Sequence, residues 1–177
     1  MTGGSGLDDA IVVALGGNLP GDFKSSEALL EAALAQFPQA GLPVLARSGW
    51  WRSAAWPDRR GNEYRNGVAI VEANGPPSAV LEALFAIERS FGRTRGVANA
   101  PRTLDLDLIA HGRHVLAGPG LILPHPRAHE RGFVMGPLAE IAPAWRHPVS
   151  GETAQALAAM ASVGRDARPV PDQGPAR

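Results

Sequence analysis

The sequence contains no cysteine, which excludes disulfides, thiolate metal centres and thiol nucleophiles. It has a single lysine, Lys24, and its 17 basic residues are balanced by 17 acidic ones. A neutral chain offers no global attraction to nucleic acid or to an anionic membrane surface. No segment approaches the roughly 18 consecutive apolar residues of a membrane span, and the first residues lack the regions of a leader peptide. We therefore expect a soluble, cytoplasmic protein in which any positively charged site is local.

Length and composition are those of one compact domain. With 177 residues, 45% of them hydrophobic, the chain can bury one full core and is short for two. The last residues, GRDARPVPDQGPAR, and the first eight have the composition of flexible ends. We expect a single domain over residues 1–177, with an ordered core at about residues 9–163.

Hydrophobic periodicity predicts the order strand, helix, strand, strand, helix, strand. The strands are expected at residues 11–16, 44–53, 63–73 and 103–110. Apolar residues at helical spacing predict one helix that begins at Ser25 or Ser26 and another that ends at Gly92. This order is the ferredoxin-like βαββαβ fold of the α+β class, an antiparallel sheet with both helices on one face. A hairpin that turns at Gly112 and returns through residues 114–116 is expected next, followed by short helices such as FVMGPLAEIA.

The glycine-rich stretch GGNLPGD after the first strand has two glycines at the spacing of a phosphate-binding loop. Asp22 stands at the lysine position of that motif and Phe23 at the hydroxyl position. An acid there would repel a triphosphate. We interpret this stretch as a structural turn, which Asn18 is suited to fix.

The run TLDLDLI places two carboxylates on one face of a strand. Because side chains alternate between faces, Asp105 and Asp107 point one way and the leucines between them the other. Two such carboxylates repel each other unless a cation or solvent lies between them. The preceding stretch, residues 88–102, carries Arg89, Arg93, Arg95 and Arg102. Paired acids beside arginines suit Mg²⁺-dependent phosphoryl transfer from a nucleotide, and an amphipathic strand with surface salt bridges is the simpler alternative.

The five histidines include no HExxH motif, which argues against the histidine-ligated zinc site that this motif forms. His125 stands between two prolines in LPHP, a placement typical of a structural role. Core packing is the simplest role for Trp56, Tyr64 and Phe133, and stacking on a flat ligand ring is the alternative.

Four segments, in order, resemble a known family. They are ALGGN, WRS with EYRN, PRTLDLDLI, and LPHPRAHERGFVMGPLAEIAP, spread over about residues 11–157. Together they resemble the 6-hydroxymethyl-7,8-dihydropterin pyrophosphokinases of folate biosynthesis. The resemblance implies a ferredoxin-like fold and an ATP-dependent transfer of diphosphate to the pterin hydroxymethyl group, with release of AMP.

The resemblance also implies roles for individual residues. Two Mg²⁺ ions would be bound by Asp105 and Asp107, with Asp107 near the attacking hydroxyl group. The implied catalytic residues are Asp107, Arg93, Arg95 and Arg102. The implied ATP contacts are Glu88, Arg93, Arg95, Arg102, His125 and Arg131. The implied pterin contacts are Ser53, Trp56 and Asn66 at the edge of the ring, and Tyr64 and Phe133 on its two sides.

The chain departs from the family pattern at a few positions. Ala54 and Ala55 stand where prolines are usual, Asn99 where a tryptophan is common, and Pro126 where an aromatic residue follows the histidine. These departures affect loop contacts and leave the paired aspartates in place.

The expected partners are therefore ATP and the reduced pterin alcohol, with no nucleic acid and no membrane, and the chain is expected to act as a monomer. A different class of protein shares this strand order, namely ferredoxin-like modules that bind single-stranded nucleic acid or a small ligand without catalysis. Such modules carry an RNP1-like run, which is missing here, and aspartates on the binding face would repel phosphate.

Overall fold

The computed structural model describes residues 5–55, 60–92 and 104–171. Its main sheet has the strand order β5-β1-β4-β3-β8, with β2 also paired to β4. The strands are β1 (Ile11–Gly17), β2 (Val44–Arg47), β3 (Trp51–Ser53), β4 (Tyr64–Val71), β5 (Asp105–His111), β6 (Leu116–Gly118), β7 (Leu121–Leu123) and β8 (Arg168–Pro169). The α-helices are α1 (Ser5–Asp8), α2 (Ser26–Ala35), α3 (Pro77–Ser90), α4 (Gly132–Ile141) and α5 (Ala154–Met160).

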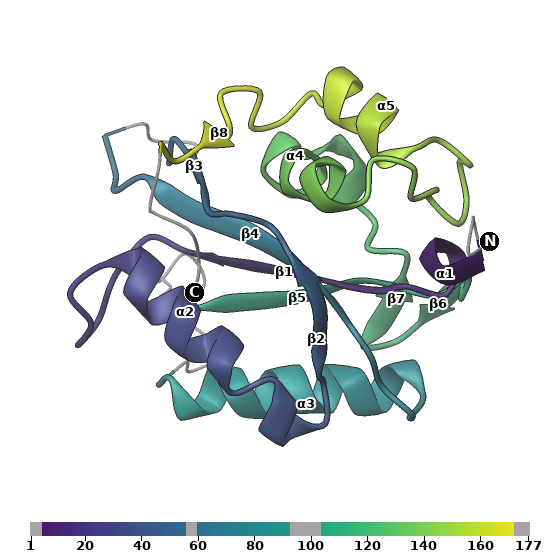
Figure 1. The fold of residues 1–177 in the computed structure, drawn as a ribbon, viewed down its shortest axis with the longest axis horizontal. Coiled ribbons are helices and arrows are strands. Elements are labelled where there is room, and N and C mark those ends of the chain that lie inside the picture. The colour runs from purple at the N-terminus through teal and green to yellow at the C-terminus, as the bar shows by residue number, and fades with distance from the viewer. Residues whose placement is uncertain (1–4, 56–59, 93–103, 172–177) are drawn as a thin grey trace.

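Helices cover both faces of the sheet (Figure 1). On one face, α2 and α3 pack against β1, β4 and β5 through a core that includes Leu30, Leu84 and Leu106. On the other face, α4 and α5 form a second core with the same strands, which includes Met135 and Leu138. The first face is the ferredoxin-like arrangement predicted from the sequence, and the α4 helix expected from FVMGPLAEIA is also confirmed.

The two predicted helices begin and end near the expected residues. The hydroxyl group of Ser25 caps α2 by accepting a hydrogen bond from the Ala28 amide at 3.0 Å. After α3, Gly92 has a φ of 83°, a left-handed conformation that suits glycine and stops the helix. The turn before α2 is held by its backbone, because the Phe23 amide donates to the Pro20 carbonyl at 3.0 Å. The side-chain oxygen of Asn18 has no hydrogen-bond partner among the described residues, so the predicted turn-fixing role is not observed for this atom.

The run expected as one strand over 44–53 is divided into β2 and β3. Between them, Ser48 donates its amide to the Val68 carbonyl and accepts from the Val68 amide through its hydroxyl group, both at 2.9 Å. A side chain thus takes the place of a backbone carbonyl in the sheet ladder. Gly67 on β4 makes room for this change, since a Cβ there would lie 2.6 Å from the ring of Trp50.

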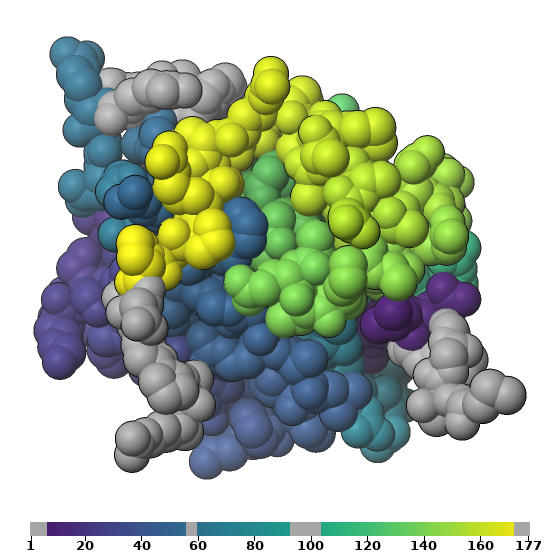
Figure 2. Space-filling model, turned by 45° about the horizontal axis from the view of Figure 1, so that its top comes forward, coloured from purple at the N-terminus to yellow at the C-terminus, as the bar shows by residue number. Residues whose placement is uncertain are grey.

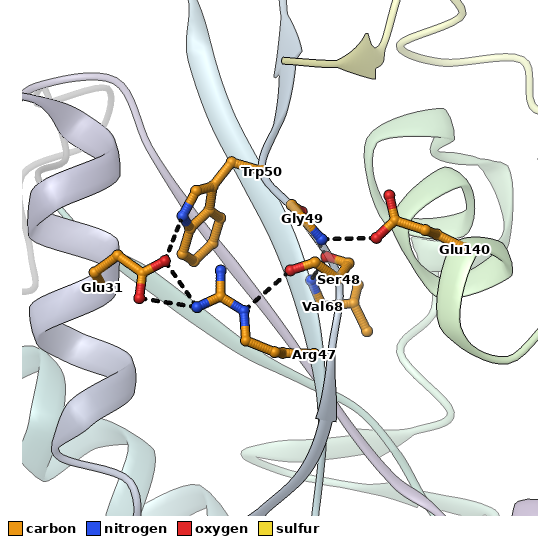
Figure 3. A network of polar contacts seen from close by, with 7 residues as sticks. All are labelled: Glu31, Arg47, Ser48, Gly49, Trp50, Val68 and Glu140. Atoms are coloured by element: carbon orange, nitrogen blue, oxygen red, sulfur yellow. Dashed lines mark hydrogen bonds and ion pairs between the residues drawn. The ribbon is translucent and has the colours of Figure 1, made fainter. Parts of the chain in front are cut away.

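Two carboxylates, one from each side of the sheet, form hydrogen bonds with residues at the break between β2 and β3 (Figure 3). From α2, Glu31 accepts hydrogen bonds from Arg47 at 2.7 and 2.8 Å and from the indole of Trp50 at 2.9 Å. From α4, Glu140 accepts from the Gly49 amide at 2.6 Å. The start of β3 is therefore fixed to both helical layers.

Two expectations about the C-terminal part differ from the structure. The chain turns at Gly112, but residues 114–116 do not return along β5; the hairpin forms between β6 and β7, around Gly120 with a φ of 86°. Residues 168–169, expected in a flexible tail, pair with β3 as β8. Composition misses this strand because pairing at a sheet edge uses backbone groups and needs no apolar side chains.

Within the described residues, no helix is long and apolar enough to cross a membrane.

Candidate active site

The paired aspartates lie on the sheet face that α4 covers. Across the sheet, Asp107 is opposite Ala14 and Asp105 is opposite Gly16. Residues opposite each other on neighbouring strands share a face, and Ala14 belongs to the core beneath α4. The three neighbouring leucines, Leu104, Leu106 and Leu108, are buried in the core beneath α2 and α3. The alternation predicted from the sequence is therefore confirmed, and it directs both carboxylates away from the α2 and α3 layer.

The same face continues across the sheet to a buried polar pair. Gly16 is opposite Asn66, and the Asn66 side-chain amide donates to the hydroxyl group of Ser53 at 2.9 Å. Both residues are buried, with 6% and 4% of their surface exposed. Gly16 makes room for the asparagine, because a Cβ at that position would lie 3.1 Å from the Asn66 side-chain oxygen. Ser53 is in turn opposite Tyr64.

Glu88 approaches β5 from the opposite layer. It lies on α3 with 1% of its surface exposed, and its Oε2 atom accepts from the Leu106 amide at 2.9 Å. Leu106 stands between the two aspartates on an edge strand, where backbone groups lack a neighbouring strand on one side. Glu88 thus fixes the backbone that carries the paired acids, and its contact with nucleotide stays a prediction.

His125 is held beside β5, because its amide donates to the Ile109 carbonyl at 2.8 Å. Burial lowers the pKa of His125 to about 4, helped by the positive charges of Arg131 and Arg127 and opposed by Asp105. The ring is therefore neutral at pH 7. Its Nδ1 atom accepts from the Arg127 amide at 3.2 Å, which places the ring proton on Nε2, ready to donate.

Arg131 and Phe133 lie at the start of α4. Arg131 is the N-cap residue, and its guanidinium carbon lies 5.7 Å from the centroid of the Phe133 ring. Phe133 also contacts the C-terminal segment, because a Cβ at Gly164 would lie 2.5 Å from its ring. The start of α4 thus presents a cation and an aromatic ring on the same side of the sheet as the paired acids.

The remaining sequence-predicted site residues, Arg93, Arg95, Arg102 and Trp56, lie outside the described residues. Of the others, the structure joins Ser53 to Asn66 and couples His125 electrostatically to Asp105 and Arg131. Their ligand contacts stay predictions.

The donor set is compatible with magnesium held jointly by protein and substrate. Among the described residues, no group of three or more histidine, cysteine or acidic side chains could hold an ion by itself. Two carboxylates on one strand face supply part of an oxygen shell, and Mg²⁺ is commonly bound by one or two carboxylates together with phosphate oxygens and water.

The sequence did not indicate two carboxylates that bind backbone amides close to the two ends of β3. Glu140 binds the Gly49 amide, and Asp166 accepts from the Ala54 amide at 2.7 Å. Ala54 and Asp166 are separated by 112 positions, so no local pattern could have indicated their contact.

A ferredoxin-like sheet with paired carboxylates on its edge strand β5, and with a histidine and an arginine on the same side, is compatible with phosphoryl transfer. A family model described as 7,8-dihydro-6-hydroxymethylpterin-pyrophosphokinase matches residues 12–143. The chain belongs to this family, and the enzyme class expected from the sequence, a pyrophosphokinase, is confirmed.

Curated relatives agree with the family assignment. The chain is 43% identical over 143 residues to the 2-amino-4-hydroxy-6-hydroxymethyldihydropteridine pyrophosphokinase of Synechocystis, covering 80% of this chain and 71% of the relative. It is 36% identical over 159 residues to the Pseudomonas aeruginosa protein of the same name, covering 90% and 96%.

Solved structures show the same fold. A Plasmodium falciparum HPPK-DHPS crystal structure matches with a TM-score of 0.67 and 12% identity, covering 90% of this chain and 47% of that chain. This chain therefore spans about half of that longer protein, and the likeness concerns the fold alone.

Proposed function

We propose that this chain transfers the terminal diphosphate of ATP to the hydroxymethyl group of 6-hydroxymethyl-7,8-dihydropterin, releasing AMP, as a step of folate biosynthesis. The observation that carries the proposal is the continuous row on the α4 face of the sheet. Asp105, Gly16 and Asn66 are opposite one another on β5, β1 and β4, and Asn66 holds Ser53. One end of the row suits metal-bound phosphates and the other suits a flat heterocycle.

The reaction forms one bond and breaks one. The pterin hydroxyl oxygen attacks the β-phosphorus of ATP and its proton passes to water, the bond from the β-phosphorus to the bridging oxygen on the α side breaks, and AMP leaves with that oxygen. Two bound Mg²⁺ ions would neutralise the phosphate charge that otherwise opposes this attack. Positioning and electrostatics then lower the barrier, without a covalent enzyme intermediate.

On the phosphate side, we assign the two magnesium ions to Asp105 and Asp107, on the edge strand that Glu88 fixes. The Nε2 hydrogen of the neutral His125 ring donates to a phosphate oxygen, and Arg131 supplies positive charge beside it. The resemblance adds Arg93, Arg95 and Arg102 to this group.

On the pterin side, the Ser53–Asn66 pair provides buried polar groups at a fixed position. A pterin ring edge carries both hydrogen-bond donors and acceptors, and an amide side chain offers both in return. Tyr64, opposite Ser53, and Phe133, on α4, are assigned to the two faces of the ring, where stacking would orient the hydroxymethyl group. The resemblance adds Trp56.

Product analysis tests this proposal. The purified chain is mixed with ATP, Mg²⁺ and the reduced pterin alcohol, and the nucleotide products are separated by chromatography. We expect AMP in an amount equal to the pterin consumed. Formation of ADP would contradict diphosphate transfer, and pterin binding without turnover would favour a ligand-binding module.

A further inference from the structure

The segment over residues 161–171, named here the C-terminal strap, connects α5 to the edge of the main sheet. Near its start, the Val163 carbonyl accepts from the Gly132 amide at the beginning of α4 at 2.8 Å. Near its end, β8 pairs with β3, and the Val170 amide donates to the Trp50 carbonyl at 2.9 Å. Figure 2 shows this yellow segment lying over the surface between the blue strands and the green α4 region.

Between these two attachments, the strap contacts the loop that follows β3. The Oδ2 atom of Asp166 accepts a hydrogen bond from the Ala54 amide at 2.7 Å. The pairing of β3 with β4 ends at Ser53 opposite Tyr64, so Ala54 is the first residue beyond the sheet ladder. Hydrogen bonds from a backbone amide to a carboxylate are about twice as strong as those between neutral groups.

The strap also contacts Phe133, the aromatic residue assigned to one face of the pterin ring. Gly164 has a φ of 66°, and a Cβ there would lie 2.5 Å from Cδ1 of Phe133. The backbone of Gly164 therefore lies against the face or edge of that ring. The strap thus contacts both the polar edge and one aromatic wall of the proposed pterin site, from a part of the chain beyond residues 12–143 that the family model matches.

We propose that Asp166 is a positioning residue for pterin binding. By holding the Ala54 amide, it fixes the backbone of residues 53–55 in the conformation that receives the ring edge. A loop ordered before binding loses less conformational entropy when the ligand arrives. Asp166 therefore acts on the affinity for pterin and leaves the phosphate side unchanged. This inference rests on the proposed function, because it requires that residues 53–55 read the pterin.

Steady-state kinetics of two substitutions test it. Asp166→Ala removes the acceptor, and we expect KM for the pterin to rise about tenfold, with KM for ATP unchanged. Asp166→Asn keeps a side-chain oxygen that can accept the same hydrogen bond, and we expect it to stay within about threefold of the wild-type KM. Asp9→Ala is the matched control, because Asp9 is an exposed aspartate near the N-terminus, and its kinetic constants should not change.

The amide resonance of Ala54 provides a readout that does not depend on activity. In the wild type we expect slow hydrogen exchange for this amide, with faster exchange in Asp166→Ala and recovery in Asp166→Asn. A wild-type Ala54 amide that exchanges as fast as an unstructured one would overturn the inference without any variant. So would an unchanged pterin KM in folded Asp166→Ala.

The two proposals fail in different ways. If the wild-type chain forms no AMP, the proposed function fails and the role of Asp166 fails with it. If the wild type forms AMP and Asp166→Ala raises both KM values equally, or lowers the melting temperature without changing either, the proposed function stands and the positioning role is wrong.

Discussion

The two faces of the main sheet differ in what they contain, although the same strands build both. The face beneath α2 and α3 is mainly apolar, with Leu84 and Leu106 fully or almost fully buried, and the buried Glu88 on this side binds the Leu106 amide. The face beneath α4 is apolar toward one end, at Val12 and Ile70, and polar toward the other, at Asp105 and Asn66. The face beneath α2 and α3 therefore contributes mainly to stability. The face beneath α4 has core residues at one end and the candidate active site at the other.

This difference arises from the residues that stand near the C-terminal end of β1. Gly16, which has no side chain, lies between Asp105 on β5 and Asn66 on β4, so the α4 face ends in polar groups there. Substitutions on the two faces should therefore separate catalysis from stability.

The largest expected effect is on activity, at the acidic end of the α4 face. Asp107→Asn removes one charged ligand of the proposed ions, and we expect kcat/KM to fall on the order of a thousandfold. The free energy of unfolding should change by less than about 1 kcal/mol, because Asp107 is only partly buried. The assay is AMP formation, together with urea unfolding.

The matched control for this change is Asp9→Asn, at an exposed position. It should retain wild-type activity. Wild-type activity in Asp107→Asn itself would show that this carboxylate binds no essential metal ion.

The next effect is on stability, on the other face. Leu84 on α3 is fully buried, and Leu84→Ala should lower the free energy of unfolding by about 2–5 kcal/mol while the folded fraction keeps its KM values. Leu45 is 62% exposed, so Leu45→Ala serves as the control, with a loss below about 0.5 kcal/mol. Equal losses for the two variants, measured by urea unfolding, would contradict the assignment of this face to the core.

A smaller effect is expected at Gly16, which lies between Asp105 and Asn66 on the α4 face. Gly16→Ala adds a methyl group 3.1 Å from the Asn66 side-chain oxygen, which displaces the amide from Ser53. We expect KM for the pterin to rise about tenfold, measured by initial rates at saturating ATP.

Gly118 on β6 has nothing within 4 Å of an added Cβ, so Gly118→Ala is the control and should leave the kinetic constants unchanged. If Gly16→Ala affects ATP and pterin equally, the two ends of the row do not bind different substrates.

A further effect, which depends on pH, concerns the titration of His125. Because its pKa is lowered from 6.5 to about 4 in the folded protein, the unfolded chain binds more protons between these values, and stability falls as the pH drops from 6.5 towards 4. His125→Gln should remove this part of the acid sensitivity. Urea unfolding at pH 7 and at pH 4.5 measures the difference.

The same histidine reports on phosphate binding. An ATP analogue that cannot react would place negative charge beside the ring and raise the pKa of His125 in an NMR titration. A pKa that stays near 4 with the analogue bound would mean that the phosphates lie elsewhere.

Local sequence patterns predicted most of the fold. The Ser25 cap, the stop at Gly92 and the alternation around Asp105 each depend on residues a few positions apart, and such signals can be read from the chain directly. The break at Ser48 could not be predicted in this way, because its hydroxyl group replaces a carbonyl only when Val68 lies opposite.

The candidate site was likewise predictable from the sequence only in part. Period-two alternation in TLDLDLI indicated a shared face for the acids, and the resemblance supplied residues such as His125 and Asn66 that composition alone would have left as core or structural positions. Asp166 carried no such signal, because the tail around it resembles a flexible end in composition. Its contact with Ala54 comes from the pairing of β8 with β3, which is a long-range event.

A crystal structure of the chain with Mg²⁺, the reduced pterin alcohol and an ATP analogue that cannot react tests the central claim most directly. We expect both ligands on the α4 face of the sheet, with the phosphates and metal ions at Asp105 and Asp107 and the ring edge at Ser53 and Asn66. Phosphates bound away from the paired aspartates, or a pterin that does not contact Asn66, would contradict the assignment of this face to catalysis.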